Sequence, residues 1–204
     1  MSKASIVVVS SGVSQPSSTR LLADRLAEAV SDELAARGRE SDVRVVEVRE
    51  LAHEVVNMTL TGYAAAPLAD AQAALAAADG VIAVTPVFTS GPAGIFKSFL
   101  DVLDTAALAG TPVLLGATGG TPRHSLVLEY AIRPVFTYLH ADAVPTSVFA
   151  ATDDWAQDAD DARSLPDRVR RAAAELADRI AARPPTRRPG RYDGVPDFED
   201  LLGG

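Results

Sequence analysis

Hydroxyl side chains are concentrated in one short segment near the start of the chain, residues 10–19. The segment lies between a predicted strand at 4–10 and a predicted helix at 19–37, so its hydroxyls and amides gather at a helix N-terminus. The unpaired N–H groups and the dipole of such a terminus favour an anion by roughly 0.3–1 kcal/mol per charge. One ordinary helix cap would explain one of these side chains. It does not explain Ser11, Ser14, Ser17, Ser18 and Thr19 together, so the segment predicts a site for a phosphate monoester.

Two better-known phosphate motifs do not match the chain. The dinucleotide fingerprint G-x-G-x-x-G needs three glycines in a tight turn, and this segment has only Gly12. The run from Gly91 to Ser98 resembles a P-loop, but two bulky residues separate Gly94 from Lys97, where the motif needs them adjacent. Lys97 is therefore predicted to lie on a helix surface.

Two further glycine-bearing segments follow predicted strands. Residues 85–92 combine two prolines with apolar side chains, which suits the face or edge of a flat aromatic ligand; the alternative is a plain connection with a buried Phe88. Residues 117–124 contain Gly119 and Gly120, which allow backbone amides to approach a ligand closely, or which simply turn the chain. Amides at this position would bond the polar edge of the same ligand.

The order of apolar runs predicts the elements that must bring these segments together. Strands are expected at 4–10, 43–48, 80–87, 112–118 and 146–151. Helices are expected at 19–37, 51–58, 67–78, 94–103 and 124–139, with a break at Pro134, and a last one begins at a Ser164 cap completed by Asp167. This alternation predicts an α/β fold, with a five-stranded parallel sheet covered on both faces. One ligand can touch all three segments if the strand order is 2-1-3-4-5, because ligands bind beyond the carboxyl ends of such strands.

Composition excludes several classes of function. The 204 residues carry 19 Lys and Arg against 27 Asp and Glu, a net charge of −8, so no basic footprint for nucleic acid is expected. There is no cysteine, and His53, His124 and His140 are too scattered for a metal site. No apolar run approaches the roughly 18 residues of a membrane span. These features predict a soluble protein of the reducing cytoplasm that contacts neither membrane nor nucleic acid.

Together, the three segments resemble the NADPH-dependent FMN reductases of the flavodoxin-like superfamily. The resemblance covers nearly the whole chain and rests on Ser11-Gly12-x-x-x-x-Ser17-Ser18-Thr19-x-Leu21, on Thr85-Pro86-Val87-Phe88 continuing to Gly94-x-x-Lys97-x-x-x-Asp101, and on Ala117-Thr118-Gly119-Gly120-Thr121-Pro122-Arg123-His124-Ser125. Each motif is weak alone, but all three occur in order after the expected strands. The resemblance implies a flavodoxin-like three-layer sandwich with FMN as cofactor and NADPH or NADH as electron donor.

The resemblance also implies roles for the matched residues. It places the FMN phosphate on Ser11, Ser17, Ser18 and Thr19, the ring system beside Pro86, Val87 and Phe88, and the polar edge of the ring on Thr118, Gly119 and Gly120. Arg123 and His124 become candidates for the phosphates of NADPH, although both could simply flank the next helix. Many relatives have Tyr where this chain has Phe88, and many have an arginine early in the first loop, for which Arg20 is the nearest substitute. No catalytic side chain and no metal is implied, since the flavin carries the redox chemistry.

The implied activity is hydride transfer from NADPH or NADH to FMN, with reduced flavin supplied to a partner flavin-dependent monooxygenase in the subgroup that the chain resembles. Two alternatives on the same fold remain open: an NAD(P)H-dependent quinone or azo reductase, and a flavodoxin-like electron carrier with no nucleotide substrate. The carrier fits less well, because the chain has a single Trp155 and few tyrosines to flank a flavin.

The composition changes near the C-terminus. Residues 1–183 are predicted to form the FMN-binding domain, and 184–204 a Pro/Arg-rich linker and tail. Phe198, Leu201 and Leu202 either fray with the tail or dock on the body or on a second subunit. The resemblance implies a homodimer, or a dimer of dimers, because the rim of the flavin site in this fold is often completed across a subunit interface.

Overall fold

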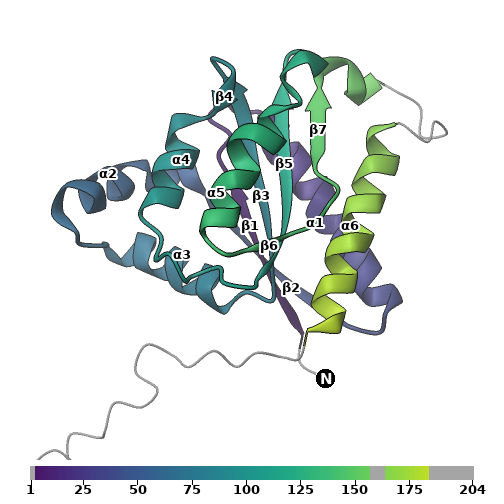
Figure 1. Cartoon of the computed structure of the whole chain (residues 1–204), viewed down its shortest axis with the longest axis horizontal. Coiled ribbons are helices and arrows are strands. Elements are labelled where there is room, and N and C mark those ends of the chain that lie inside the picture. The colour runs from purple at the N-terminus through teal and green to yellow at the C-terminus, as the bar shows by residue number, and fades with distance from the viewer. Residues whose placement is uncertain (1–2, 157–163, 184–204) are drawn as a thin grey trace, which may run out of the picture.

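The computed structural model describes residues 3–156 and 164–183. They form three layers, with a twisted central sheet between two groups of helices (Figure 1). The predicted linker and tail, with Phe198, Leu201 and Leu202, lie outside the described residues.

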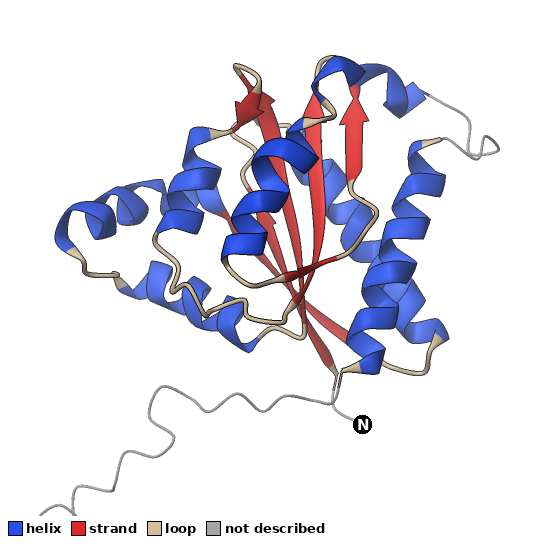
Figure 2. Cartoon of the chain, in the orientation of Figure 1, coloured by secondary structure: helices blue, strands red, loops and turns tan. Residues whose placement is uncertain are grey.

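The sheet has the predicted parallel core. β1 (Ala4–Ser10) pairs in parallel with β2 (Ser41–Glu47) on one side and with β3 (Gly80–Phe88) on the other. β3 pairs in parallel with β5 (Pro112–Gly119), so the four long strands run β2-β1-β3-β5. Crossovers between parallel strands bring their carboxyl ends to one edge, where the arrowheads point in Figure 2. The flavodoxin-like fold class is confirmed.

Strand number differs from the prediction, because the sheet has seven strands rather than five. The fifth position is divided between β6 (Asp142–Ala143), which pairs with the start of β5, and β7 (Val148–Ala151), which pairs with its end. Pro145 lies between them and has no N–H for the ladder. The seventh strand is β4 (Gly91–Pro92), which folds back antiparallel on the end of β3.

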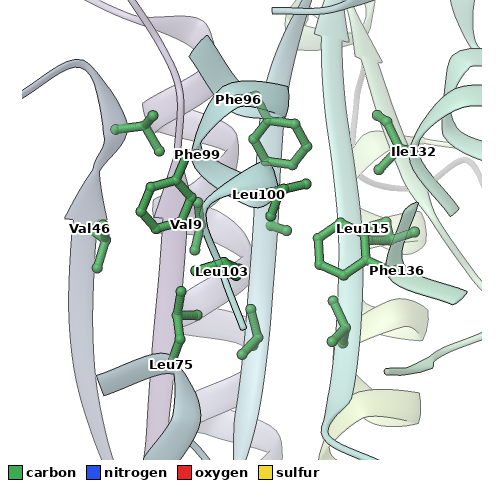
Figure 3. Packing of buried hydrophobic residues seen from close by; sticks show 14 of the residues in the cluster. Val9, Val46, Leu75, Phe96, Phe99, Leu100, Leu103, Leu115, Ile132 and Phe136 are labelled. Atoms are coloured by element: carbon green, nitrogen blue, oxygen red, sulfur yellow. The ribbon is translucent and has the colours of Figure 1, made fainter. Parts of the chain in front are cut away.

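Two hydrophobic clusters follow from the alternation of side chains along the buried strands. Alternate residues such as Ile6 and Val8 face α1 (Ser18–Ala36) and α6 (Leu165–Ala182). Their neighbours, such as Val9, face the second helical layer, in which Phe96, Phe99 and Phe136 are the largest fully buried side chains (Figure 3). That layer consists of α2 (Ala52–Thr61), α3 (Ala66–Ala77), α4 (Gly94–Asp101) and α5 (Arg133–Tyr138).

Shorter helical segments complete the chain. Val48–Leu51, Pro122–His124 and Thr152–Ala156 are 3₁₀ turns, and Leu128–Ile132 forms a π-helical turn. Pro134 stands in the first turn of α5, so the predicted helix at 124–139 is interrupted just before it. Ser164 caps α6 by accepting a bond from the Asp167 N–H at 3.4 Å, as predicted.

Neither a membrane span nor a metal cluster is found within 3–156 and 164–183. No helix in these ranges is long and apolar enough to cross a bilayer. Nor does this part of the chain gather three or more His, Asp or Glu side chains into a group that could hold a metal ion.

Candidate functional site

A cavity of about 330 Å³ lies at the carboxyl ends of β1, β3, β5 and β7. Four segments that are distant in the sequence contribute to it. The described lining residues are Val13, Ser14, Ser17, Ser18, Thr19, Pro86, Val87, Phe88, Thr118, Gly119, Gly120, Ala150, Thr152 and Trp155. Its volume falls at the lower end of the roughly 300–1,000 Å³ usual for small-molecule sites, and its position matches the ligand position of open α/β sheets.

The hydroxyl-rich segment forms the N-terminus of α1. Ser17 is the N-cap, and its Oγ accepts a bond from the Arg20 N–H at 3.2 Å. The first bond within the helix runs from the Leu21 N–H to the Ser17 carbonyl at 3.0 Å, so the amides of Ser18 and Thr19 precede it. Hydroxyls and free amides are therefore presented together at the positive end of a 19-residue helix.

Close packing holds this loop in place. A Cβ on Gly12 would lie 2.1 Å from the Ser17 Oγ and 3.3 Å from the Thr19 Cβ, so any other residue here would displace the Ser17 hydroxyl. Thr19 and Thr118 are both buried, and their hydroxyl oxygens are 2.7 Å apart in a hydrogen bond. This bond joins the start of α1 to the end of β5, two segments 99 residues apart in the sequence.

The apolar wall is carried by the turn between β3 and β4. Phe88 is 49% exposed. It is followed by Thr89 and Ser90, whose φ angles of 49° and 64° lie in the left-handed region that non-glycine residues rarely adopt. The pairing of Phe88 with Gly91 closes this two-residue turn. Below it, the Ala93 N–H donates to the Thr85 Oγ1 at 3.1 Å, which fixes the chain as it enters α4.

The described lining contains no charged side chain. Six hydroxyl groups, those of Ser14, Ser17, Ser18, Thr19, Thr118 and Thr152, stand there with the helix-end amides. A Cβ on Gly120 would meet no protein atom within 4 Å, so the chain leaves open space at this rim. The cavity thus suits a flat aromatic molecule bearing a phosphate, held by local hydrogen bonds rather than by a basic field.

Comparison with known proteins decides the family. Residues 4–156 match the family described as NADPH-dependent FMN reductase. The chain belongs to this family.

Individual relatives agree with that assignment. The chain is 33% identical over 172 residues to an FMN reductase (NADPH) of Pseudomonas aeruginosa, covering 84% of this chain and 90% of that protein. It superimposes on an oxidoreductase from Corynebacterium diphtheriae with a TM-score of 0.85 and 42% identity, over 89% and 99% of the two chains. A structure described as NADH:FMN oxidoreductase (EmoB), in apo form, gives a TM-score of 0.75 and 30% identity, over 91% and 94%.

In this FMN reductase, most of the residues predicted to hold FMN line the cavity at the carboxyl ends of the strands. Ser17, Ser18, Thr19, Pro86, Val87, Phe88, Thr118, Gly119 and Gly120 all line it. Ser11 is placed differently: it is fully buried, and both its N–H and its Oγ lie within hydrogen-bond distance of the Val84 carbonyl, at 3.1 and 3.4 Å. Ser11 therefore extends the pairing of β1 with β3 and is absent from the lining.

The two residues predicted to bind the nicotinamide nucleotide stand apart from the cavity lining. Arg123 and His124 occupy the 3₁₀ turn after β5, where Arg123 is exposed and His124 is half-buried. Their contact with NADPH stays a prediction.

Sequence reasoning missed Val13 and the contribution of β7. Ala150, Thr152 and Trp155 line the cavity, and they lie at or beyond the carboxyl end of the predicted fifth strand. The rule that identified the other three segments applies equally to this one, so the signal was present.

Arg20, the predicted substitute for an arginine on the phosphate, is paired with two carboxylates, and its contact with phosphate stays a prediction. Its guanidinium pairs with Asp24, at 2.7 Å, and with Glu47, and these hydrogen bonds raise the pKa of Arg20. A second cavity, of about 340 Å³, lies on this side of the same loop and includes Arg20, Asp24, Glu47 and Arg49 in its lining. Because Arg20 is already paired with two carboxylates, this cavity presents less net positive charge to an anion than its arginines suggest.

Proposed function

We propose that the cavity binds FMN and that the protein is an NAD(P)H-dependent FMN reductase. The observation that carries the proposal is that one cavity is lined by the hydroxyl-rich N-terminus of α1, by Phe88 at the turn after β3, and by Gly119 and Gly120, which we call the glycine rim. Membership of the family gives the same activity. FMN, when bound, would supply the redox chemistry by accepting a hydride from the reduced nicotinamide.

The chain's own contribution is binding and orientation. Ser17, Ser18 and Thr19 would hold the phosphate with hydroxyls and amides. Phe88 and Val87 would border the flat ring, and the segment Thr118–Gly120 would bond its polar edge, where donors stabilise the charge that develops on reduction. The described lining offers no carboxylate, imidazole or ammonium group. Hydride transfer to a flavin needs no such group from the protein, so the lining suits the reaction.

The visible absorption spectrum of the purified protein with FMN tests the proposal. Anaerobic addition of NADPH or NADH should bleach the oxidised flavin, and steady-state turnover should require free or bound FMN. A flavin that stays oxidised would instead indicate an electron carrier. Turnover with quinones or azo compounds but not with FMN would indicate the alternative reductase.

Several finer features belong to the same proposal. NADPH and NADH are both candidate donors, and Arg123 and His124 are candidate ligands of the NADPH phosphates. Ser11 stays a candidate for the FMN phosphate, next to Ser17, Ser18 and Thr19. We also propose that the enzyme works in the cytoplasm and passes reduced flavin to a flavin-dependent monooxygenase. A coupled assay checks the transfer, since a purified monooxygenase of this type should turn over only when the reductase, FMN and NAD(P)H are all present.

We further propose a homodimer as the working form. Leu126 and Tyr130 are 62% and 79% exposed on the segment that follows the glycine rim, and Tyr138 on α5 is 70% exposed. Large exposed side chains with apolar surface often mark an interface, and a second copy would cover them. Sedimentation velocity should give the mass of a dimer, or of a dimer of dimers, rather than that of one 21.3 kDa chain.

A further inference from the structure

The only tryptophan of the chain lies in the wall of the cavity. We propose that Trp155 is an FMN-contacting residue and that the Asp154–Arg168 ion pair is the positioning element that holds it there. This inference rests on the proposed function, because it assigns a further part of the same FMN site.

The position of Trp155 is set by two helices as well as by the cavity. Its side chain is half-buried and packs against the hydrophobic cluster between the sheet and α1 and α6. The guanidinium carbon of Arg25, on α1, lies 5.0 Å from the centroid of the indole ring, within the range of a cation–π interaction. The indole therefore links α1 to the cavity. It lies beyond β7, at the opposite edge of the sheet from β2.

An ion pair from α6 fixes the turn that carries this indole. Asp154 accepts a bond from the Ala151 N–H at 2.7 Å through one oxygen, and from the Arg168 guanidinium at 2.6 Å through the other. Arg168 also donates to the carbonyl of Phe149, the second residue of β7. The side chains of Arg168 and Asp154 are only 28% and 15% exposed. One arginine thus ties β7 to the turn at 152–156.

The chemistry of the position fits FMN. An indole offers a flat apolar face to the ring or ribityl chain of the flavin and a single N–H donor to its oxygens. Phe88 supplies the other large aromatic side chain of the described lining, from the far side of β5. Arg25 packs over this indole from α1, so the ring that lines the cavity is held between that helix and the site.

Equilibrium titration of the apoprotein with FMN tests the contact. Flavin fluorescence is the signal, so that variants without tryptophan are measured in the same way. Trp155→Leu keeps apolar bulk but removes the indole, and Trp155→Phe keeps a flat ring. We expect Trp155→Leu to bind FMN about tenfold more weakly, which corresponds to about 1.4 kcal/mol, and Trp155→Phe to recover most of the loss. Equal affinity of Trp155→Leu and the unsubstituted protein would overturn the contact.

The positioning role has its own test. Arg168→Met should weaken FMN binding and shift the emission of Trp155, since the turn would lose its tie to α6. Arg179→Met is the matched control, because Arg179 lies on the same helix and forms an exposed ion pair with Asp142 far from the cavity. Identical binding and emission in the two variants would show that the Asp154–Arg168 pair positions nothing.

Failure of the proposed function gives a different result. FMN binding that depends on Trp155, without oxidation of NADPH or NADH, would leave this inference standing and refute the reductase. If the protein oxidises NAD(P)H with FMN and Trp155→Leu binds FMN as tightly as the unsubstituted protein, the reductase would stand and this inference would be refuted. Apoprotein that binds no FMN at all would refute both.

Discussion

Replacing Gly12 with alanine tests how residues 12–19, the loop proposed to bind the FMN phosphate, are held in place. The new Cβ would lie 2.1 Å from the Ser17 Oγ, 3.1 Å from the Ser17 Cβ and 3.3 Å from the Thr19 Cβ. The first of these distances is far below any tolerated contact, so the Ser17 hydroxyl must rotate away. Its bond from the Arg20 N–H, at 3.2 Å, is then lost. The single methyl group therefore removes the cap of α1 as well as crowding the loop.

The expected cost follows from three contributions. Loss of a serine N-cap costs about 1 kcal/mol, and crowding by an added methyl group costs about 1–3 kcal/mol in a packed site. The φ of Gly12 is not in the left-handed region, so alanine also restricts the unfolded chain and returns about 0.4–1 kcal/mol. We expect Gly12→Ala to lower the free energy of unfolding by about 1–3.5 kcal/mol and to weaken FMN binding.

A double-mutant cycle with Ser17→Ala isolates the mechanism. Ser17→Ala alone removes the cap, so Gly12→Ala in that background has no hydroxyl left to displace and should cost about 1 kcal/mol less. Urea unfolding of the four proteins, followed by circular dichroism, measures this coupling. Costs that add to within about 0.3 kcal/mol would refute the reasoning, because the two changes would then act independently.

Three further predictions concern other parts of the molecule. Ser17→Asp places a carboxylate where the phosphate would bind, and should abolish FMN retention with an unchanged circular dichroism spectrum, since Asp also caps helices well. Thr19→Val and Thr118→Val each break the buried 2.7 Å bond and leave one hydroxyl unpaired, so each should cost about 1–3 kcal/mol in urea unfolding, and the double variant less than their sum. Hydrogen bonds from Arg133 hold the pKa of Glu129 below its ordinary value of 4.5. The protein should therefore be more stable than Glu129→Gln at pH values above 4.5, and this difference should disappear as the pH falls through the lowered pKa.

Each of these predictions has a clear contrary result. Normal flavin content in Ser17→Asp would remove the phosphate from this loop. Strict additivity of the two threonine variants would mean that their hydroxyls do not depend on each other in solution. A stability difference between the Glu129 proteins that stays constant from neutral pH to pH values well below 4.5 would show that the Arg133 pair does not set this titration.

The sheet and the three predicted segments of the cavity lining could be predicted because each is indicated by a short stretch of sequence. Continuous apolar runs such as Ala4–Ser10 indicated buried parallel strands, and the hydroxyls at 17–19 indicated a helix end that binds an anion. The carboxyl-end rule then brought three loops to one place. Ser164 and Pro134 likewise act within one or two helical turns, and the structure places a cap at the first and a helix start at the second.

The remaining features depend on contacts that one segment does not encode alone. The direction of Ser11 is set by the Val84 carbonyl, 73 residues away. The turn after Phe88 places Thr89 and Ser90 in a conformation that these residue types seldom adopt, so no sequence signal announces β4. Trp155 reaches the cavity because Arg168, from α6, holds its turn through Asp154. Two signals were present but not used: Pro145 divides the fifth strand, and the carboxyl-end rule also applies to the segment that follows this strand.

Anaerobic mixing of the purified protein with FMN and NADPH, and separately with NADH, tests the central claim most directly. The account predicts that the visible absorbance of oxidised flavin disappears with at least one donor, and that Ser17→Asp, folded but unable to hold the phosphate, loses this reaction. Flavin that remains oxidised with both donors, in a protein shown to bind FMN, would contradict the assignment as an FMN reductase.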